Sequence, residues 1–141
     1  MAERKSKNLI GALEQFFAKL PKLPGSVSEV LVGIAPWLAL VFGILGIIAG
    51  FSALGLSPLA IFAGVSASFM VLTSGVAAII SSVLLLMAFS KLKKRAYRGW
   101  ELLFWSEVVS AASAVLSITI GSVLGVLIGF YLLFQIKRYY K

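Results

Sequence analysis

Glu107 is the side chain with the clearest potential for chemistry, because the sequence offers few others. Its 141 residues include no Cys, no His and no Asp. Thiolate catalysis, Ser-His dyads and metal sites built from His or Cys are therefore excluded. Glu107 lies inside an apolar stretch, and an ionised carboxylate at membrane depth is costly unless it is paired, protonated or hydrated. It is a candidate proton- or cation-responsive group.

A structural role is the alternative for Glu107. Antiparallel packing of the last two predicted helices would bring Glu107 close to Tyr131 and Gln135, which could hydrogen-bond to it, and Glu101 close to Lys137. Because Glu107 is expected near the membrane interface rather than at mid-membrane, we favour this structural pairing over a transport role. Together, Glu107, Gln135 and Tyr131 form the predicted embedded polar site.

Serines recur along the apolar blocks but give no sign of a catalytic nucleophile. Neither Ser74 nor Ser106 has a base or an oxyanion partner in the sequence around it. We therefore predict no enzyme activity, no cofactor and no metal. The serines either line a water path or hydrogen-bond to carbonyl oxygens one turn back, and we favour the latter.

Long uncharged blocks carry these residues. The chain is 60% hydrophobic with a mean hydropathy of +1.03, has no charged residue from Val30 to Ser90, and has only Glu101 and Glu107 from Trp100 to Ile136. Such blocks are too long and too apolar for the core of a soluble protein. The composition predicts an all-α integral membrane protein.

The thirteen Lys and Arg residues fall into three clusters: before Gly25, in a central loop, and at the C-terminus. The positive-inside bias places all three clusters, and so both termini, on the cytoplasmic side. The loop cations are predicted to contact anionic lipid headgroups; they are Lys91, Lys93, Lys94, Arg95 and Arg98. A nucleic-acid partner is not expected, since clusters that flank apolar spans differ from a basic folded face.

The predicted architecture is a four-helix transmembrane bundle over 26–141, with spans at about 27–51, 58–90, 100–119 and 121–138. Ser26 and Glu29 have the spacing of a capping box that would start the first span. The block 58–90 exceeds one membrane thickness. We predict a short or re-entrant segment over about 59–69 before a span over about 71–89. One very tilted helix is the alternative, and charge bias counts against two crossings broken near Thr73.

An amphipathic helix is predicted in the N-terminal segment 1–25, from Asn8 to Leu20, after an unstructured start. Pro21 and Pro24 would end it. It is expected to lie in the membrane interface, and packing on the cytoplasmic ends of the spans is the alternative.

Two sets of small residues at helical spacing predict close helix packing. The first set is Gly43, Gly46 and Gly50, and the second is Gly121, Gly125 and Gly129. For the second set we favour contact with the preceding helix of the same chain over contact with a neighbouring subunit, because the hairpin partner is always available.

The second half of the chain, in Leu92 to Phe104 and Gly129 to Tyr140, resembles small uncharacterised four-span membrane proteins of bacteria. The resemblance implies a multi-pass protein of the bacterial inner membrane and implies no activity. Small multidrug transporters also have four spans and a buried Glu, but this chain has no Glu in its first span and a charge bias too strong for dual insertion.

The sequence therefore predicts a non-enzymatic membrane protein that acts in helix packing, self-association or assembly with a membrane-protein partner. The alternative is a small oligomeric transporter or channel with Glu107 as its proton- or cation-responsive group. A third reading is membrane-surface sensing by the helix that ends at Leu20.

Overall fold

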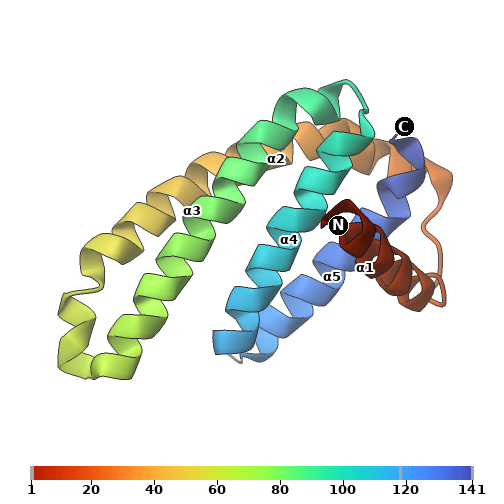
Figure 1. The fold of residues 1–141 in the computed structure, drawn as a ribbon. Helices are drawn as coiled ribbons and strands as arrows, with labels where there is room; N and C mark the ends of the chain where they lie inside the picture. The colour runs from red at the N-terminus through yellow and green to blue at the C-terminus, as the bar shows by residue number, and fades with distance from the viewer. Residues whose placement is uncertain (1, 118, 141) are drawn as a thin grey trace.

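The chain is entirely helical over the residues that the computed structural model describes, 2–117 and 119–140, as the sequence predicts. The elements are α1 (Ala2–Phe17), α2 (Gly25–Leu56), the 3-10 helix η1 (Leu59–Ala63), α3 (Val65–Lys93), α4 (Tyr97–Ser117), α5 (Ile120–Ile136) and the 3-10 helix η2 (Lys137–Tyr139). In Figure 1, α2 and α3 form one long hairpin, α4 runs back beside α3, and α5 returns beside α4. Helix α1 lies at the end where α5 finishes.

Three helical stretches among the described residues are long and apolar enough to cross a membrane: Gly25–Leu56, Val65–Lys93 and Ile120–Tyr139. The chain is therefore a membrane protein of the helical class. Helix α4 is not among the three; its 21 residues include Glu101 and Glu107 as well as several serines. Of these polar residues, Glu107 is the one that the sequence singles out for chemistry.

Helices α2 and α3 pack closely because three glycines of α2 face α3. A Cβ atom at Gly43 would lie 2.8 Å from Leu86, and one at Gly50 would lie 3.0 Å from the carbonyl oxygen of Gly75. At Gly46 it would overlap the Ser82 hydroxyl. Without side chains at these positions the two backbones come close enough for extensive van der Waals contact.

Aromatic side chains form the core where α4 and α5 meet. Trp100 and Phe104 are 0% exposed. Their rings stack on each other with centroids 5.7 Å apart, and both contact the ring of Phe134 on α5. The Trp100 Nε1 group donates a hydrogen bond to Leu133 O at 2.8 Å, so the indole is satisfied within this core.

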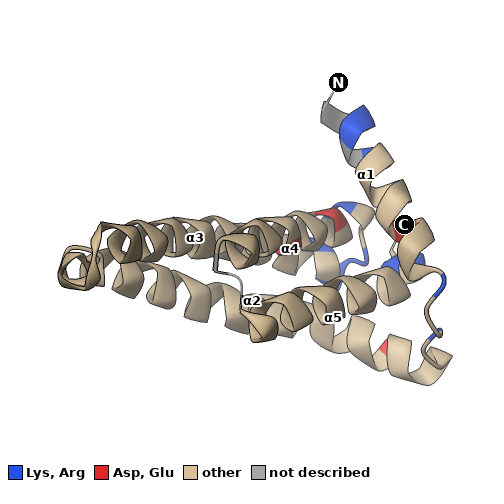
Figure 2. Ribbon diagram, turned by 90° about the horizontal axis from the view of Figure 1, so that it is seen from below, with Lys and Arg blue, Asp and Glu red and all other residues tan. Residues whose placement is uncertain are grey.

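The basic residues gather at one end of the bundle, the end that carries this aromatic core (Figure 2). There the Lys93 ammonium lies 5.1 Å from the centre of the Trp37 ring, a cation-π distance. Burial raises the pKa of Tyr140 above its ordinary value, and the charge of Arg95 offsets part of that rise. The C-terminal residues thus lie beside the central basic loop.

The N-terminal segment departs from the prediction at three points. Helix α1 begins at Ala2 rather than Asn8, and it ends at Phe17 rather than Leu20. Helix α2 begins at Gly25, and its N-cap Pro24 makes no side-chain cap hydrogen bond. The predicted capping box is wrong because Ser26 already lies in the first turn; the earliest helical bond runs from Ser28 N to Pro24 O.

The short segment predicted before the second span corresponds to η1, but the division between the two falls earlier than the expected position near residue 70. The break falls at Gly64, whose φ of 118° a residue with a side chain would rarely adopt. Helix α3 then runs unbroken for 29 residues, and Thr73, at the site considered for a break, bonds its hydroxyl to Phe69 O inside the helix. The first span extends past the predicted 51 to Leu56.

Candidate functional site

Glu107 extends from α4 toward α5, where Gly129 leaves room for it. A Cβ atom added at Gly129 would overlap the Glu107 carboxyl group. Among the described residues none donates a hydrogen bond to Glu107 or forms an ion pair with it. The carboxyl group of Glu107 therefore has no partner from the part of the chain that is described.

The partners predicted for Glu107 bind another segment. Tyr131 Oη donates to Pro21 O at 2.5 Å, Gln135 Nε2 donates to the same oxygen at 3.3 Å, and Leu23 N donates to Gln135 Oε1 at 3.1 Å. The predicted embedded pairing of Glu107 with Tyr131 or Gln135 is wrong. The rotation of α5 places Gly129 opposite Glu107. At about 100° per residue, the side chains of Tyr131 and Gln135 point in directions about 200° and 240° around the helix axis from Gly129, away from Glu107.

The expected neighbourhood of Glu101 is also different. Lys137 Nζ pairs with Glu14 Oε2 of α1 at 2.6 Å, and no ion pair to Glu101 occurs within the described ranges. Helix α1 takes this position because Phe17 stacks on Phe134 with ring centroids 5.5 Å apart. The Lys137 ammonium thus pairs with Glu14 of α1 and also lies 5.5 Å from the centre of the Trp100 ring on α4, so it contacts α4 through this ring and not through Glu101.

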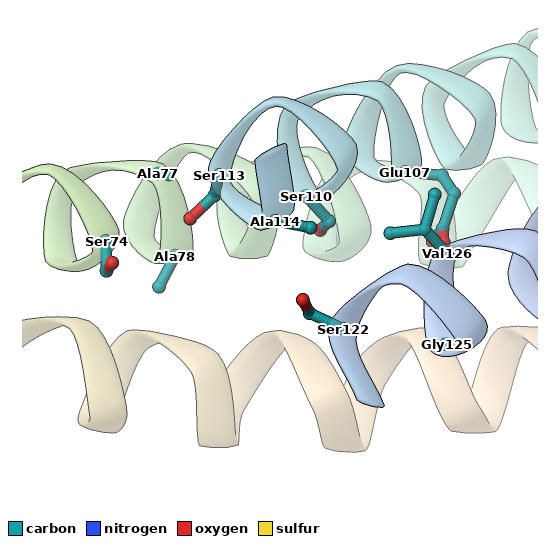
Figure 3. Close-up of a pocket in the computed structure, with 10 residues that line it drawn as sticks. All are labelled: Ser74, Ala77, Ala78, Glu107, Ser110, Ser113, Ala114, Ser122, Gly125 and Val126. Carbon is teal, nitrogen blue, oxygen red and sulfur yellow. The ribbon is translucent and has the colours of Figure 1, made fainter. Parts of the chain in front are cut away.

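A cavity of about 360 Å³ adjoins Glu107 between α3, α4 and α5. Figure 3 shows Glu107 toward one end of this cavity and Ser74 toward the other, with Ser110, Ser113 and Ser122 between them. The rest of its lining is Ala77, Ala78, Ala114, Gly125 and Val126. Small side chains create the space, and the Glu107 carboxyl group and the serine hydroxyl groups are polar points in a mostly apolar lining.

A second cavity, of about 320 Å³, lies on the other side of Glu107, toward α2. It shares Glu107 and Ser110 with the first cavity and is lined further by residues such as Leu103 and Ala35. On α4 the first cavity extends away from Glu107 toward Ala114, and the second extends toward Leu103. Glu107 thus stands where two successive hollows along the bundle meet.

The aromatic core closes the bundle beyond the second cavity. Phe104 contacts Phe130 with ring centroids 5.8 Å apart, and Trp100 lies one turn further toward the basic end. Both Trp100 and Phe104 are fully buried. These packed rings therefore separate the second cavity from the basic end of the bundle.

The groups around Glu107 suit a proton or a small monovalent cation. One carboxylate and several hydroxyl groups supply hard oxygen ligands with a single negative charge. No cluster of three or more His, Cys, Asp or Glu residues that could hold a metal ion occurs in the described ranges. The Ser110 hydroxyl already donates to Ser106 O at 3.0 Å, but its oxygen keeps lone pairs that can accept or coordinate.

The two predicted glycine sets behave differently. Gly43, Gly46 and Gly50 all face α3, whereas a Cβ at Gly121 or Gly125 would meet nothing within 4 Å. The favoured contact of the second set with the preceding helix therefore exists only at Gly129, where the neighbour is a carboxyl group. Contact of the other two glycines with a second subunit stays a prediction.

The loop cations lie at the basic end, where Lys93, Lys94, Arg95 and Arg98 are exposed and Lys91 is half-buried. Their contact with anionic lipid stays a prediction. Ser74 and Ser110 line the first cavity, which is the alternative that the sequence left open for the serines of these helices, and Ser122 on α5 is a lining residue that the sequence did not indicate. Hydrogen bonds from serine hydroxyls to carbonyl oxygens one turn back do occur, as favoured, at Ser110 and Ser82. The sequence feature that could have indicated the cavity is the occurrence of serines together with alanines and glycines on three helices.

Comparison of the chain with protein-family models, with curated proteins and with solved structures finds no match.

Proposed function

We propose that the chain crosses the bacterial inner membrane four times, with both termini and the central basic loop on the cytoplasmic side. The connectivity supports a fourth crossing: α3 ends at the basic end and α5 begins at the opposite end, so α4 has to carry the chain back (Figure 1). With 21 residues, α4 is about 32 Å long, enough for a hydrocarbon core of about 30 Å. The gathering of cations at one end agrees with the positive-inside bias (Figure 2).

We propose further that this protein moves a proton or a small monovalent cation across the membrane through Glu107. The observation that carries the proposal is the position of the carboxyl group between two cavities, without a partner among the described residues. A carboxyl group buried for structural reasons alone would be expected to have a satisfied hydrogen-bond donor beside it. Glu107 instead borders space that water or an ion can enter.

The surrounding helices give this transport a direction. The first cavity reaches Glu107 from the half of the bundle away from the basic end, while the rings of Trp100 and Phe104 block the other half. A cation that arrives from the outer side can bind to Glu107 and the nearby serine oxygens. Release to the cytoplasmic side requires the packed rings to move, which makes them the gate of the proposed path.

Purified protein in sealed vesicles of defined lipid tests this proposal. An imposed pH, sodium or potassium gradient should collapse faster with wild-type protein than in protein-free vesicles. Glu107→Gln keeps the size of the side chain and removes its charge, so it should reduce the flux to the protein-free level. Glu101→Gln is the matched control on the same helix; Glu101 lines neither cavity, and its variant should keep wild-type flux.

Equal flux in the Glu107→Gln and wild-type proteins, for every cation tested, would refute transport through Glu107. Loss of flux in both variants would show that the measured effect depends on net charge and not on the cavity. Size-exclusion elution and helical circular dichroism of each variant establish that it is folded.

Self-association through α5 is a second candidate function, and a different observation favours it. A Cβ atom added at Gly121 would meet nothing within 4 Å, and the nearby Leu124 and Ile128 are 53% and 58% exposed; a Cβ at Gly125 would also meet nothing, although Gly125 lines the first cavity. A small-residue face that stays open within the chain can accept a helix of another copy. Chemical cross-linking in lipid should give dimers or larger species that Gly121→Leu abolishes. A monomer at all protein-to-lipid ratios would rule this candidate out.

A further inference from the structure

A third hollow lies at the basic end, away from Glu107, between α1 and the C-terminal part of α5. It has a volume of about 230 Å³. Phe17 and Phe134 form its apolar wall, Gln135 contributes an amide, and Lys22 and Arg138 contribute positive charge. None of these five residues belongs to the lipid-contact loop predicted from the sequence.

The two sides of this hollow are held together by specific contacts. Phe17 and Phe134 stack with their ring planes 21° apart, and Gln135 bonds to both Pro21 O and Leu23 N of the linker between α1 and α2. The Lys137–Glu14 ion pair joins the same two helices at 2.6 Å. The hollow is therefore formed before any ligand enters, which reduces the ordering cost of binding.

The charge of the hollow is positive. Glu14 is the one acidic residue of its lining, and the Lys137 ammonium already neutralises it. Lys22 makes no ion pair within the described residues. The Arg138 guanidinium lies 5.0 Å from the centre of the Tyr139 ring, and its Nη2 donates to Tyr139 Oη at 3.1 Å. That contact holds the guanidinium while its other N–H groups stay free to donate.

We infer that the hollow between α1 and α5 binds a phosphate group, of the kind that anionic phospholipids present at this depth of the membrane. Lys22 and Arg138 would donate charge-assisted hydrogen bonds to the phosphate oxygens, the Gln135 amide would add a polar contact, and the rings of Phe17 and Phe134 would receive the apolar part of a lipid. The site binds one phosphate group at a defined position, in contrast to a general attraction between the basic end and the bilayer.

The bound phosphate would also join α1 to the bundle. Lys22 belongs to the segment that follows α1, and Arg138 belongs to η2, directly after α5. A ligand that contacts both cations adds a link between the two segments and stabilises their contact in proportion to its occupancy. The thermal stability of the protein in detergent should therefore rise with added ligand.

Titration of the full chain in a neutral, phosphate-free detergent tests the inference. Short-chain phosphatidylglycerol, glycerol phosphate and inorganic phosphate are added separately, and binding is followed by isothermal calorimetry and by the shift in unfolding temperature. Lys22→Gln combined with Arg138→Gln should weaken binding by at least about tenfold, since two charge-assisted hydrogen bonds are lost. Lys94→Gln combined with Arg98→Gln removes the same charge from the other loop at this end and should change binding less than about twofold.

The comparison of ligands identifies the source of the phosphate. Preference for phosphatidylglycerol supports a lipid site with an apolar wall, and equal affinity for inorganic phosphate supports a site for a free phosphate ion. Ala18→Leu fills the hollow without changing any charge and should also abolish binding. Absence of binding by wild-type protein, or equal weakening in the two double variants, would overturn the inference.

Discussion

The α2–α3 hairpin and the α4–α5 hairpin carry the same sequence signal and use it differently. Each has three glycines spaced three or four residues apart on one helix. In the first hairpin all three glycines face the partner helix at close range, whereas in the second only Gly129 does, and its neighbour there is the Glu107 carboxyl group. One hairpin is closely packed, and the other borders an open cavity of about 360 Å³ that Glu107 and several serines line.

The difference shows that small residues permit close approach but do not cause it. In the first hairpin the residues opposite the glycines can interlock with the groove: Leu86, Ser82 and Ile79. In the second hairpin, the Glu107 carboxyl group occupies the groove at Gly129. Cβ atoms added at Gly121 and Gly125, nearer the start of α5, would meet nothing within 4 Å. The same glycine pattern therefore occurs in a closely packed hairpin and in one that borders a cavity.

The largest effect is expected from placing the same large side chain in both hairpins. Gly50→Leu would have to displace Ile79 and the backbone oxygen of Gly75, so it should lower the free energy of unfolding by about 3 kcal/mol. Gly121→Leu should change it by less than about 0.5 kcal/mol, since its Cβ meets nothing. Helix propensity favours Leu over Gly at both positions, and less at Gly121 in the first turn of α5, so it cannot explain a loss of stability in Gly50→Leu. Unfolding in denaturing detergent measures both.

Equal destabilisation by the two variants would contradict the comparison, because it would mean that α5 is as closely packed as α2. A Gly50→Leu variant that folds normally would mean that α2 and α3 can separate without loss of structure.

An intermediate effect is expected at Gly129, which faces the neighbouring helix closely but contacts a carboxyl group there. Gly129→Ala adds a methyl group in the space of the Glu107 carboxyl group and should lower the free energy of unfolding by about 1.5 kcal/mol. It should also reduce cation flux, since the carboxyl group has to move away from the cavity. In a Glu107→Ala background the same methyl group should cost less than about 0.5 kcal/mol.

This double-mutant cycle separates crowding by the carboxyl group from a general intolerance of α5. An equal cost of Gly129→Ala in both backgrounds would show that Glu107 is not what fills the groove.

Much of the helical architecture could be predicted from the sequence, because the absence of charge from Val30 to Ser90 leaves few alternatives. The exact ends could not. Gly64 breaks the chain, while Gly46, Gly50 and Gly55 continue a helix, and the sequence does not reveal which glycine will adopt a positive φ. Ser26 and Glu29 have the spacing of a capping box, but Pro24 directs the chain into the helix before Ser26 can cap it.

The candidate site was only half predictable. Glu107 was identifiable because a carboxyl group in an apolar block is rare. Its surroundings were not, since they depend on the rotation of α5 about its own axis. That rotation follows from contacts far away in the sequence: Gln135 and Tyr131 bind the linker at Pro21, and this turns Gly129 toward Glu107. A pattern within one helix carries no information about such a contact.

The smallest effect is expected where the two hairpins join, between α3 and α4. Ser81 Oγ donates to Ser106 O at 2.9 Å and lies 3.2 Å from Ser110 Oγ. Ser81→Ala should cost about 0.6 kcal/mol, an average value for hydrogen bonds between membrane helices, because Ser106 O keeps its bond from Ser110. Ser52→Ala is the control, since the exposed Ser52 hydroxyl donates to Ile48 O inside α2 and reaches no other helix. A cost above about 2 kcal/mol for Ser81→Ala alone would mean that this hydrogen bond, and not the packing of each hairpin, determines how the halves fit together.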